Sequence, residues 1–300
     1  MSTTHSSRRL VVTWCSAVKR RAPSLQGSAL PRAAQPQIAE AWLDMLRHAK
    51  PTDRADEVYG GRSFGLAKGV ARQFDADLAI VSAGLGYVKG ETRVPSYDFT
   101  LARGNSLGSH VLGGIDVHKW WKAMLGGPFS SSPTDDFASR QLVLVCLSRA
   151  YAPFVAPELS SVPTERLRIF GTSLNGALPE SLKACVLPYD DRLASLGFTG
   201  TRSDFAQRAL AHYATHVHSG GSLADDRARV LATMKGGHYP MPTKIHASVD
   251  DDAIRAWIRK LLPIVGARRS PMLQHLRHVE GIACEQRRFA RLFAETVERT

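Results

Sequence analysis

Short apolar runs along the chain predict the buried strands of a mostly parallel sheet. The clearest runs are residues 10–15 and 77–82, and each is followed by a loop of small or polar residues. Helical spacing of apolar positions over residues 37–48 and 63–74 predicts helices after the first run and before the second. Strands that are apolar throughout and alternate with helices are typical of a parallel sheet covered on both faces. The pattern therefore predicts a three-layer α/β fold. Further strands are expected at residues 141–147, 166–171 and 183–187.

After about residue 220 the apolar pattern becomes helical. Ser270 and Pro271 form a typical helix start, because serine caps a helix and proline suits its first turn. Gly281 separates the last two expected helices, and two helices joined by a short glycine-containing turn form the core of a helix-turn-helix. We therefore expect an α/β domain over residues 1–220 and a helical, basic, helix-turn-helix-like region over 221–300. Its helices are expected at residues 223–234, 250–262, 271–277 and 283–297.

The composition indicates a folded protein with a polyanionic partner. The chain has 300 residues, a hydrophobic content of 44% and a formal net charge of +12. This length and apolar content suffice for a full core. Lys and Arg neutralise phosphates, so the charge favours a nucleic acid. Charge alone is also compatible with anionic lipid or with a solvated basic face.

Other classes of protein are disfavoured. No run approaches the roughly 18–20 apolar residues of a membrane span, and the polar start lacks the apolar core of a signal peptide. We therefore expect a cytoplasmic protein with no membrane partner. The four cysteines are far apart and form no CxxC pair, which predicts free thiols. No group of metal ligands has a suitable spacing, so neither a metal nor a cofactor is expected.

The loop that follows the second strand carries the first candidate site. Gly84 and Gly86 allow a ligand to approach the backbone closely, and Tyr97 and Asp98 follow in the same loop. The tyrosine ring could stack on a base, while the carboxylate could act as a general base or stabilise a cation. The alternative is a core aromatic beside an aspartate that caps a turn.

A second polar group follows two later strands, within residues 170–176 and 187–192. Asn175, Asp190 and Arg192 would meet there if the two loops converge at one edge of the sheet. Paired aspartates could hold a metal, but no further ligand lies at a suitable spacing. The alternative is an ion pair that only fixes the loop, either Asp190 with Arg192 or Asp191 with Arg202.

Two basic segments are candidates for phosphate contact. Lys19 follows the first strand, and Arg62 precedes a predicted helix, where a helix N-terminus also favours an anion. The last helix begins with Gln286, Arg287 and Arg288, and such side chains reach base edges or phosphates. A solvated basic face is the alternative for both segments.

Four segments carry a resemblance to known families. They read VTWCSAVK over residues 12–19, VYGGRSF over 58–64, IVSAGLG over 80–86 and PSYDFT over 95–100. They resemble a family of bacterial proteins and the uracil-DNA-glycosylase-like domain of archaeal tRNA-guanine transglycosylases. The whole chain is similar to bacterial anti-phage DNA glycosylases that remove glucosylated hydroxymethylcytosine. It lacks the GQDPYH motif of ordinary uracil-DNA glycosylases, so their catalytic residues are not transferred.

The residues and the resemblance together predict a DNA glycosylase that leaves an abasic site, in defence against phage. Its partner would be DNA, with no obligate protein partner. The catalytic candidates are Asp98, Asn175 and Asp190. Substrate binding is expected at Cys15, Ser16, Lys19, Arg62, Ser63, Gly84, Gly86, Tyr87, Tyr97, Ser148, Tyr151, Ser173, Tyr189 and Arg192. DNA contacts are expected at Lys235, His238, Lys244, Arg268, Arg269, Gln286, Arg287, Arg288 and Arg291.

Two other classes of function fit the same sequence features. A base-exchange enzyme or nucleoside deoxyribosyltransferase needs the same sugar chemistry without duplex contacts. A DNA-binding regulator would use the α/β domain only to sense a ligand. No lysine stands in a context that marks a Schiff-base nucleophile, so we expect a monofunctional glycosylase without lyase activity.

Overall fold

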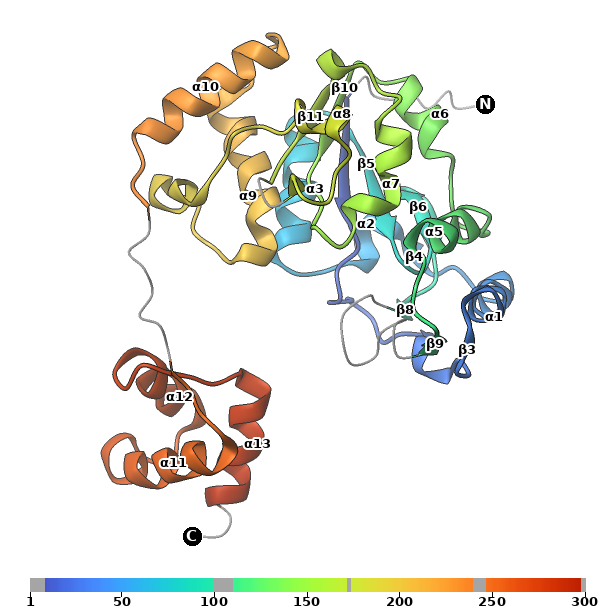
Figure 1. Ribbon diagram of the computed structural model, residues 1–300. Coiled ribbons are helices and arrows are strands. Elements are labelled where there is room, and N and C mark those ends of the chain that lie inside the picture. The colour runs from blue at the N-terminus through green and yellow to red at the C-terminus, as the bar shows by residue number, and fades with distance from the viewer. Residues whose placement is uncertain (1–8, 100–109, 172–173, 240–246, 298–300) are drawn as a thin grey trace. The chain divides into compact units, whose positions relative to one another are not determined.

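The computed structural model describes residues 9–99, 110–171, 174–239 and 247–297. The chain divides into two compact units, residues 1–239 and 240–300 (Figure 1). The first unit has the predicted α/β architecture, with a mostly parallel central sheet between helices, and the second contains the predicted C-terminal helices.

Five strands form the central sheet, in the order β11-β10-β1-β5-β6. The strands β1 (Arg9–Trp14), β5 (Asp77–Ser82), β10 (Leu142–Val145) and β11 (Leu167–Ile169) are parallel. The edge strand β6 (Gly86–Lys89) pairs antiparallel with β5, which the sequence did not predict. A central position suits β1, whose residues Leu10–Val12 are completely buried, because a strand covered on both faces needs no polar side.

The predicted strand at residues 183–187 is wrong. The helix α8 (Glu180–Lys183) occupies its start, and only a single bridge between Val186 and Ile169 continues the sheet. Pro188 follows at once, and proline has no backbone N–H to donate to a ladder. A buried apolar run here therefore marks a core segment rather than a strand.

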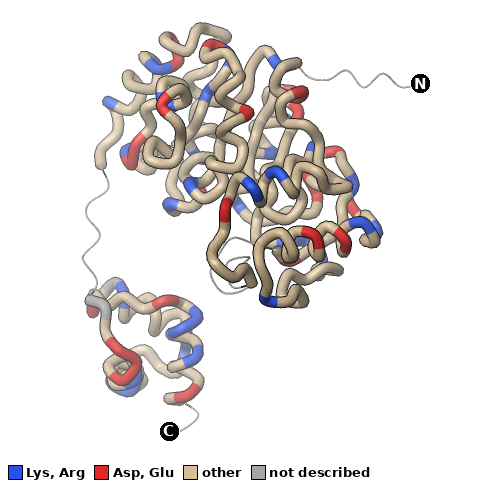
Figure 2. The backbone as a smooth tube through the Cα atoms, turned by 45° about the vertical axis from the view of Figure 1, so that its right-hand side comes forward, with Lys and Arg blue, Asp and Glu red and all other residues tan. Residues whose placement is uncertain are grey.

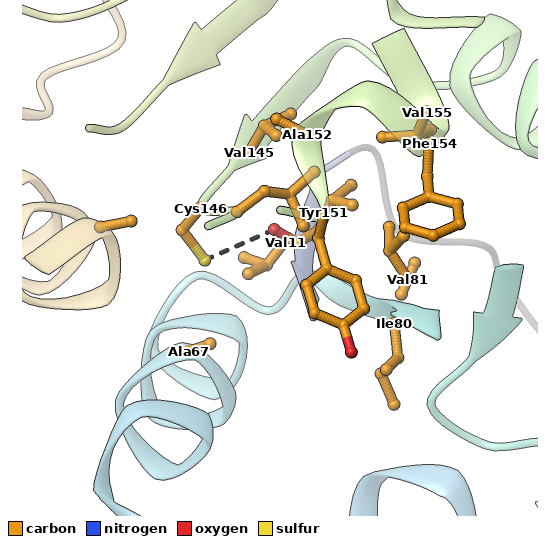
Figure 3. Close-up of a cluster of buried hydrophobic side chains, with 14 of the residues drawn as sticks. Val11, Ala67, Ile80, Val81, Val145, Cys146, Tyr151, Ala152, Phe154 and Val155 are labelled. Carbon is orange, nitrogen blue, oxygen red and sulfur yellow. Dashed lines mark hydrogen bonds between the residues drawn. The ribbon is translucent and has the colours of Figure 1, made fainter. Parts of the chain in front are cut away.

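Helices cover both faces of the sheet. The helix α3 contacts β1 and α9, while α5 contacts α1, α7 and β6. The long helices of this unit are α1 (Gln35–Arg47), α3 (Arg62–Gln73), α5 (Val117–Leu125), α6 (Pro133–Ala138), α7 (Ala152–Leu159), α9 (Phe205–His212) and α10 (Leu223–Lys235). Figure 3 shows the core where side chains of β1, β5, β10, α3 and α7 meet, and the Cys146 thiol donates there to the Val12 carbonyl at 3.4 Å.

The connections between the long helices and the sheet strands contain several short helices and strands. The helix α2 (Ala55–Val58) precedes α3, and a π-helix spans Tyr213–Val217. Single-turn 3₁₀ helices lie at Gly27–Ala29, Thr164–Arg166 and Arg202–Asp204, and a longer one spans Asp191–Leu196. Three pairs of two-residue strands are β2 (Leu25–Gln26) with β8 (Tyr97–Asp98), β3 (Ala33–Ala34) with β9 (Val111–Leu112), and β4 (Asp53–Arg54) with β7 (Arg93–Val94).

The helix α10 belongs to the first unit, so the predicted boundary at residue 220 is misplaced. Asp226 of α10 accepts from Arg168 of β11, with Nε and Oδ2 2.6 Å apart and both side chains buried. The Tyr213 hydroxyl donates to the same carboxylate oxygen at 2.7 Å. Val230 and Met234 of α10 also lie in the first core. The boundary therefore falls after residue 239.

The second unit is a small three-helix bundle. It contains α11 (Asp251–Val265), α12 (Arg269–His278) and α13 (Gln286–Val297), with a parallel pair of two-residue strands, β12 (Ala247–Ser248) and β13 (Ile282–Ala283). All three helices contact one another. Their core includes Ile258, Met272, Leu276, Phe289 and Leu292. Gly281 has φ +70°, which suits glycine in the turn between α12 and α13.

We expect Asp226→Asn to destabilise the first unit by about 3 kcal/mol or more. The substitution leaves the buried Arg168 guanidinium without its counter-charge, and breaking such a pair from one side is strongly destabilising. The measurement is the free energy of unfolding in urea. The control is Asp225→Asn, one residue away, whose exposed carboxylate accepts, among the described residues, only from Ser222. Equal loss in the two variants would contradict the structural role of the pair.

Candidate active site at the strand ends

The loop that follows β5 is held from three sides. The Ser82 hydroxyl accepts the backbone N–H of Gly84 at 3.2 Å. The indole N–H of Trp42 donates to the Gly84 carbonyl at 2.6 Å, and that of Trp120 donates to the Ala83 carbonyl at 2.8 Å. All these groups are buried, and buried hydrogen bonds of this kind are costly to break. The loop therefore offers a rigid wall at the end of the sheet.

Tyr97 is joined to this loop through its hydroxyl. Its oxygen lies 2.6 Å from the Ser82 hydroxyl and 2.8 Å from the Tyr59 hydroxyl. Tyr97 is completely buried, and this burial raises its pKa well above the usual range, so the phenol stays neutral. The predicted stacking surface is thus wrong for this structure, and the alternative of a core aromatic describes Tyr97.

Lys19 packs against the two buried phenol rings of Tyr59 and Tyr97. Its Nζ atom lies 4.9 Å from the ring centre of Tyr59 and 4.8 Å from that of Tyr97, and it donates to the Ser16 carbonyl. Backbone pairing of Lys19 with Tyr59 places it there. Burial lowers the pKa of Lys19, and the nearby charges of Cys15 and Asp98 oppose this shift. The residue is therefore an amine held at the edge of the core.

Asp98 and Cys15 complete this group. Asp98 is exposed, and its carboxylate has no hydrogen bond or ion pair with any other residue in the described part of the chain. The Cys15 thiol is buried and lies 3.2 Å from the Tyr151 hydroxyl. We call the set of Cys15, Lys19, Tyr59, Ser82, Tyr97, Asp98 and Tyr151 the strand-end cluster. It joins a free carboxylate, a half-buried amine and several neutral hydroxyls beyond the carboxyl ends of β1 and β5.

The second predicted group is present but internally paired. Its two loops lie together, since the ring centres of Phe170 and Tyr189 are 6.2 Å apart. Asp190 accepts from Arg192, with Oδ2 and Nη2 2.7 Å apart, and also from the Tyr239 hydroxyl at 3.2 Å. The hydrogen bonds from Arg192 lower the pKa of Asp190. The ion pair that fixes the loop is therefore what the structure contains.

Tyr189 and Asn175 differ in their exposure to solvent within this second group. Tyr189 is completely buried, and its hydroxyl lies 3.0 Å from His212 Nδ1, so its ring is a core side chain rather than a stacking surface. Asn175 is exposed. Because β11 lies three strands from β5, the loops after these two strands leave the sheet about 14 Å apart. No hydrogen bond or ion pair among the described residues joins Asp98 to Asn175 or Asp190.

Several other predicted substrate-binding residues have structural partners. Tyr87 is buried and donates to Asp136 at 2.7 Å. Arg62 lies 3.7 Å from the Asp204 carboxylate. Gly86 has φ +80°, which the turn into β6 requires. The half-buried residues of the predicted set are Ser16, Lys19, Ser63, Ser148 and Arg192. Ser173 lies outside the described residues.

A basic cavity beside α3 was not predicted as a site. It has a volume of about 600 Å³ and is lined by residues that include Arg20, Arg21, Asp53, Lys68, Arg72 and Ser96. Gly65 and Gly69 also line it, and a side chain at either position would meet open space. Neither Arg20 nor Arg72 forms an ion pair with a residue that the structure describes. The glycines at 65 and 69, flanked by basic residues at 68 and 72, are the sequence signal that could have revealed this cavity.

The predicted DNA contacts of the second unit divide into paired and unpaired residues. Arg288 and Arg291 both bind Asp251 at 2.7 Å, so they hold α13 against α11. Gln286 is exposed at the start of α13. Exposed cations without an ion-pair partner among the described residues of this unit include Arg268, Arg269 and Arg287. Figure 2 shows that basic and acidic positions are interspersed in each unit.

Two further predicted DNA contacts lie in the first unit rather than in the helical region. Lys235 is exposed at the end of α10, and the backbone N–H of His238 donates to the Ser195 hydroxyl at 2.9 Å. Lys244 lies outside the described residues.

No metal site or membrane-spanning helix is found among the described residues, and no related protein is found. The described residues contain no group of three or more His, Cys, Asp or Glu side chains that could hold a metal ion. None of the described helices combines the length and apolar character needed to cross a membrane. Comparison with known protein families, curated proteins and solved structures finds no significant match to this chain.

We expect Gly84→Ala to destabilise the protein by about 1–3 kcal/mol, as overpacking does in a tight core. A Cβ atom at Gly84 would lie 2.9 Å from the Tyr97 ring, which its own hydroxyl bonds hold in place. The measurement is the unfolding midpoint in urea. Gly126→Ala is the control, because its nearest neighbour would be 3.4 Å away. The loop is not rigid if the two variants are equally stable.

Proposed function

We propose that this protein is a DNA glycosylase that hydrolyses the bond between a modified base and its deoxyribose. The glucosylated hydroxymethylcytosine of phage DNA is the substrate that the sequence resemblance favours. The product is an abasic site, and the enzyme would act in defence against phage. The observation that carries this proposal is the free, exposed carboxylate of Asp98 in the strand-end cluster.

Asp98 has the chemistry that this reaction needs. Positive charge builds at C1′ of the sugar as the base leaves, and a carboxylate on that face stabilises the charge or orients the attacking water. Asp190 is a weaker candidate, because its carboxylate is already neutralised by Arg192. The charge of Asp98 acts on the Lys19 amine, so the two groups belong to the same site.

The surroundings of the cluster suit a nucleic-acid backbone. Arg20 follows Lys19 directly, and Ser96 precedes Tyr97, so the basic cavity and the strand-end cluster are built from adjacent residues of the same two segments. The cavity presents Arg20 and Arg72 without acidic partners among the described residues. An extruded nucleotide requires such phosphate contacts beside the pocket that receives the base. The net charge of +12 also favours binding to the phosphates of DNA.

The decisive experiment is incubation with two DNA duplexes, one normal and one carrying glucosylated hydroxymethylcytosine. Mass spectrometry should detect the free modified base only from the second duplex. Binding to both duplexes without any released base would instead favour a DNA-binding regulator. Release from free nucleosides but not from duplex DNA would favour a nucleoside deoxyribosyltransferase.

We expect Asp98→Asn to lower the rate of base release by about a hundredfold or more, the scale for losing one well-placed electrostatic group. An amide keeps the size of the side chain but not its charge. DNA binding and the unfolding midpoint should change little, because the carboxylate is exposed. Asp190→Asn is the matched comparison: if it abolishes release while Asp98→Asn does not, the catalytic centre is the second group.

A further inference from the structure

Lys19 has an environment unlike that of the ion-paired lysines in the described chain. Lys68, Lys119 and Lys183 each lie within 4 Å of a carboxylate oxygen, at 3.3, 3.5 and 2.6 Å. Lys19 has no such partner among the described residues and packs against two phenol rings instead. The residue is half-buried in the loop that follows β1. The Lys19 amine therefore lies at the site without an ion-pair partner among the described residues.

The ring faces and the charges of Cys15 and Asp98 favour the ammonium form of Lys19, while burial opposes it. Desolvation is the largest influence on Lys19, and it lowers the pKa of the side chain. A larger fraction of Lys19 is then unprotonated at neutral pH than for an exposed lysine. Desolvated lysines of this kind are nucleophiles toward carbonyl carbon. Lys19 is therefore a candidate nucleophile that its sequence context alone does not mark.

We propose that Lys19 is the nucleophile of an abasic-site lyase step that follows base release at the same strand-end cluster. The proposal rests on the glycosylase function above, because that reaction supplies the aldehyde. Loss of the base leaves C1′ as a hemiacetal in equilibrium with an open-chain aldehyde. The Lys19 amine and the aldehyde carbon would then meet beside Asp98.

The step balances without any further reactant. The Nζ lone pair attacks C1′, a proton is taken up and one water leaves, which gives an iminium ion. The iminium acidifies the C2′ hydrogen, whose proton passes to the Asp98 carboxylate. The electron pair of the C2′–H bond forms a C2′–C3′ double bond while the C3′–O bond breaks. The 3′ fragment leaves with a 5′-phosphate, and water then hydrolyses the imine and frees Lys19.

The test uses the full chain and a duplex with one preformed abasic site, so that it does not depend on base release. Borohydride reduces an iminium ion to a stable amine, which joins the protein covalently to the DNA. Gel electrophoresis should show this adduct for the wild type. Lys19→Arg should lower its yield at least tenfold, because a guanidinium keeps the charge and ring contacts but forms no iminium ion. Lys122→Ala, an exposed lysine of α5, is the control and should retain the adduct.

The outcomes separate this proposal from the glycosylase function. An adduct that persists in Lys19→Arg overturns the assignment of Lys19, and peptide mass spectrometry would identify the amine used. Wild-type protein that binds the abasic duplex without forming an adduct overturns the lyase step and leaves base release intact. Protein that does not bind abasic DNA at all contradicts both proposals. Lys19→Gln, with a measured unfolding midpoint, repeats the test if Lys19→Arg fails to fold.

Discussion

The hydrogen bond between the hydroxyls of Tyr97 and Ser82 holds the candidate site together. It links the segment around β8 to the end of β5, the strand beside the sheet's central β1. Tyr59 joins through the same phenol oxygen and connects the segment before α3. Because every member is buried, a missing partner would leave a polar group unsatisfied in the core. Three distant parts of the chain are therefore fixed at one point.

The chemistry of the site follows from this buried frame. Tyr97 and Tyr59 are neutral and enclosed, so they serve as the surface on which Lys19 lies. Asp98 follows Tyr97 in the chain, and successive side chains of an extended segment point to opposite sides. Burial of the tyrosine therefore directs the aspartate outward. An exposed carboxylate and a half-buried amine are the pair that the proposed function uses.

The strands that hold the site could be predicted, while their tertiary partners could not. The runs at 10–15 and 77–82 are recognisable because buried parallel strands carry apolar residues on both faces. The run at 183–187 has a similar apolar pattern but is not a strand. A proline follows it, and only a single bridge connects it to the edge of the sheet. Helix α10 has an ordinary capped pattern, and only the buried pair of Arg168 with Asp226 assigns it to the first unit. Such a pairing between distant residues leaves no local signal.

In the candidate site, too, some features could be predicted from the sequence and others could not. Asp98 is exposed as its candidate role requires, whereas Tyr97 and Tyr189 proved to be core residues. The surroundings of Lys19 come from Tyr59 and Tyr97, far away in sequence, so the lowering of its pKa by burial has no local signature. In the second unit, the pairing of Arg288 and Arg291 with Asp251 was equally hidden. Charge on a predicted helix face therefore did not distinguish ion-paired from free arginines.

Hydrogen exchange can show whether DNA reaches the strand-end cluster. Backbone exchange would be followed by mass spectrometry with and without a duplex that contains a stable abasic-site analogue. We predict slower exchange in the segments 15–21, 58–62 and 93–99. Protection confined to residues 250–297, or to the loops around Asn175 and Asp190, would show that DNA does not reach the cluster.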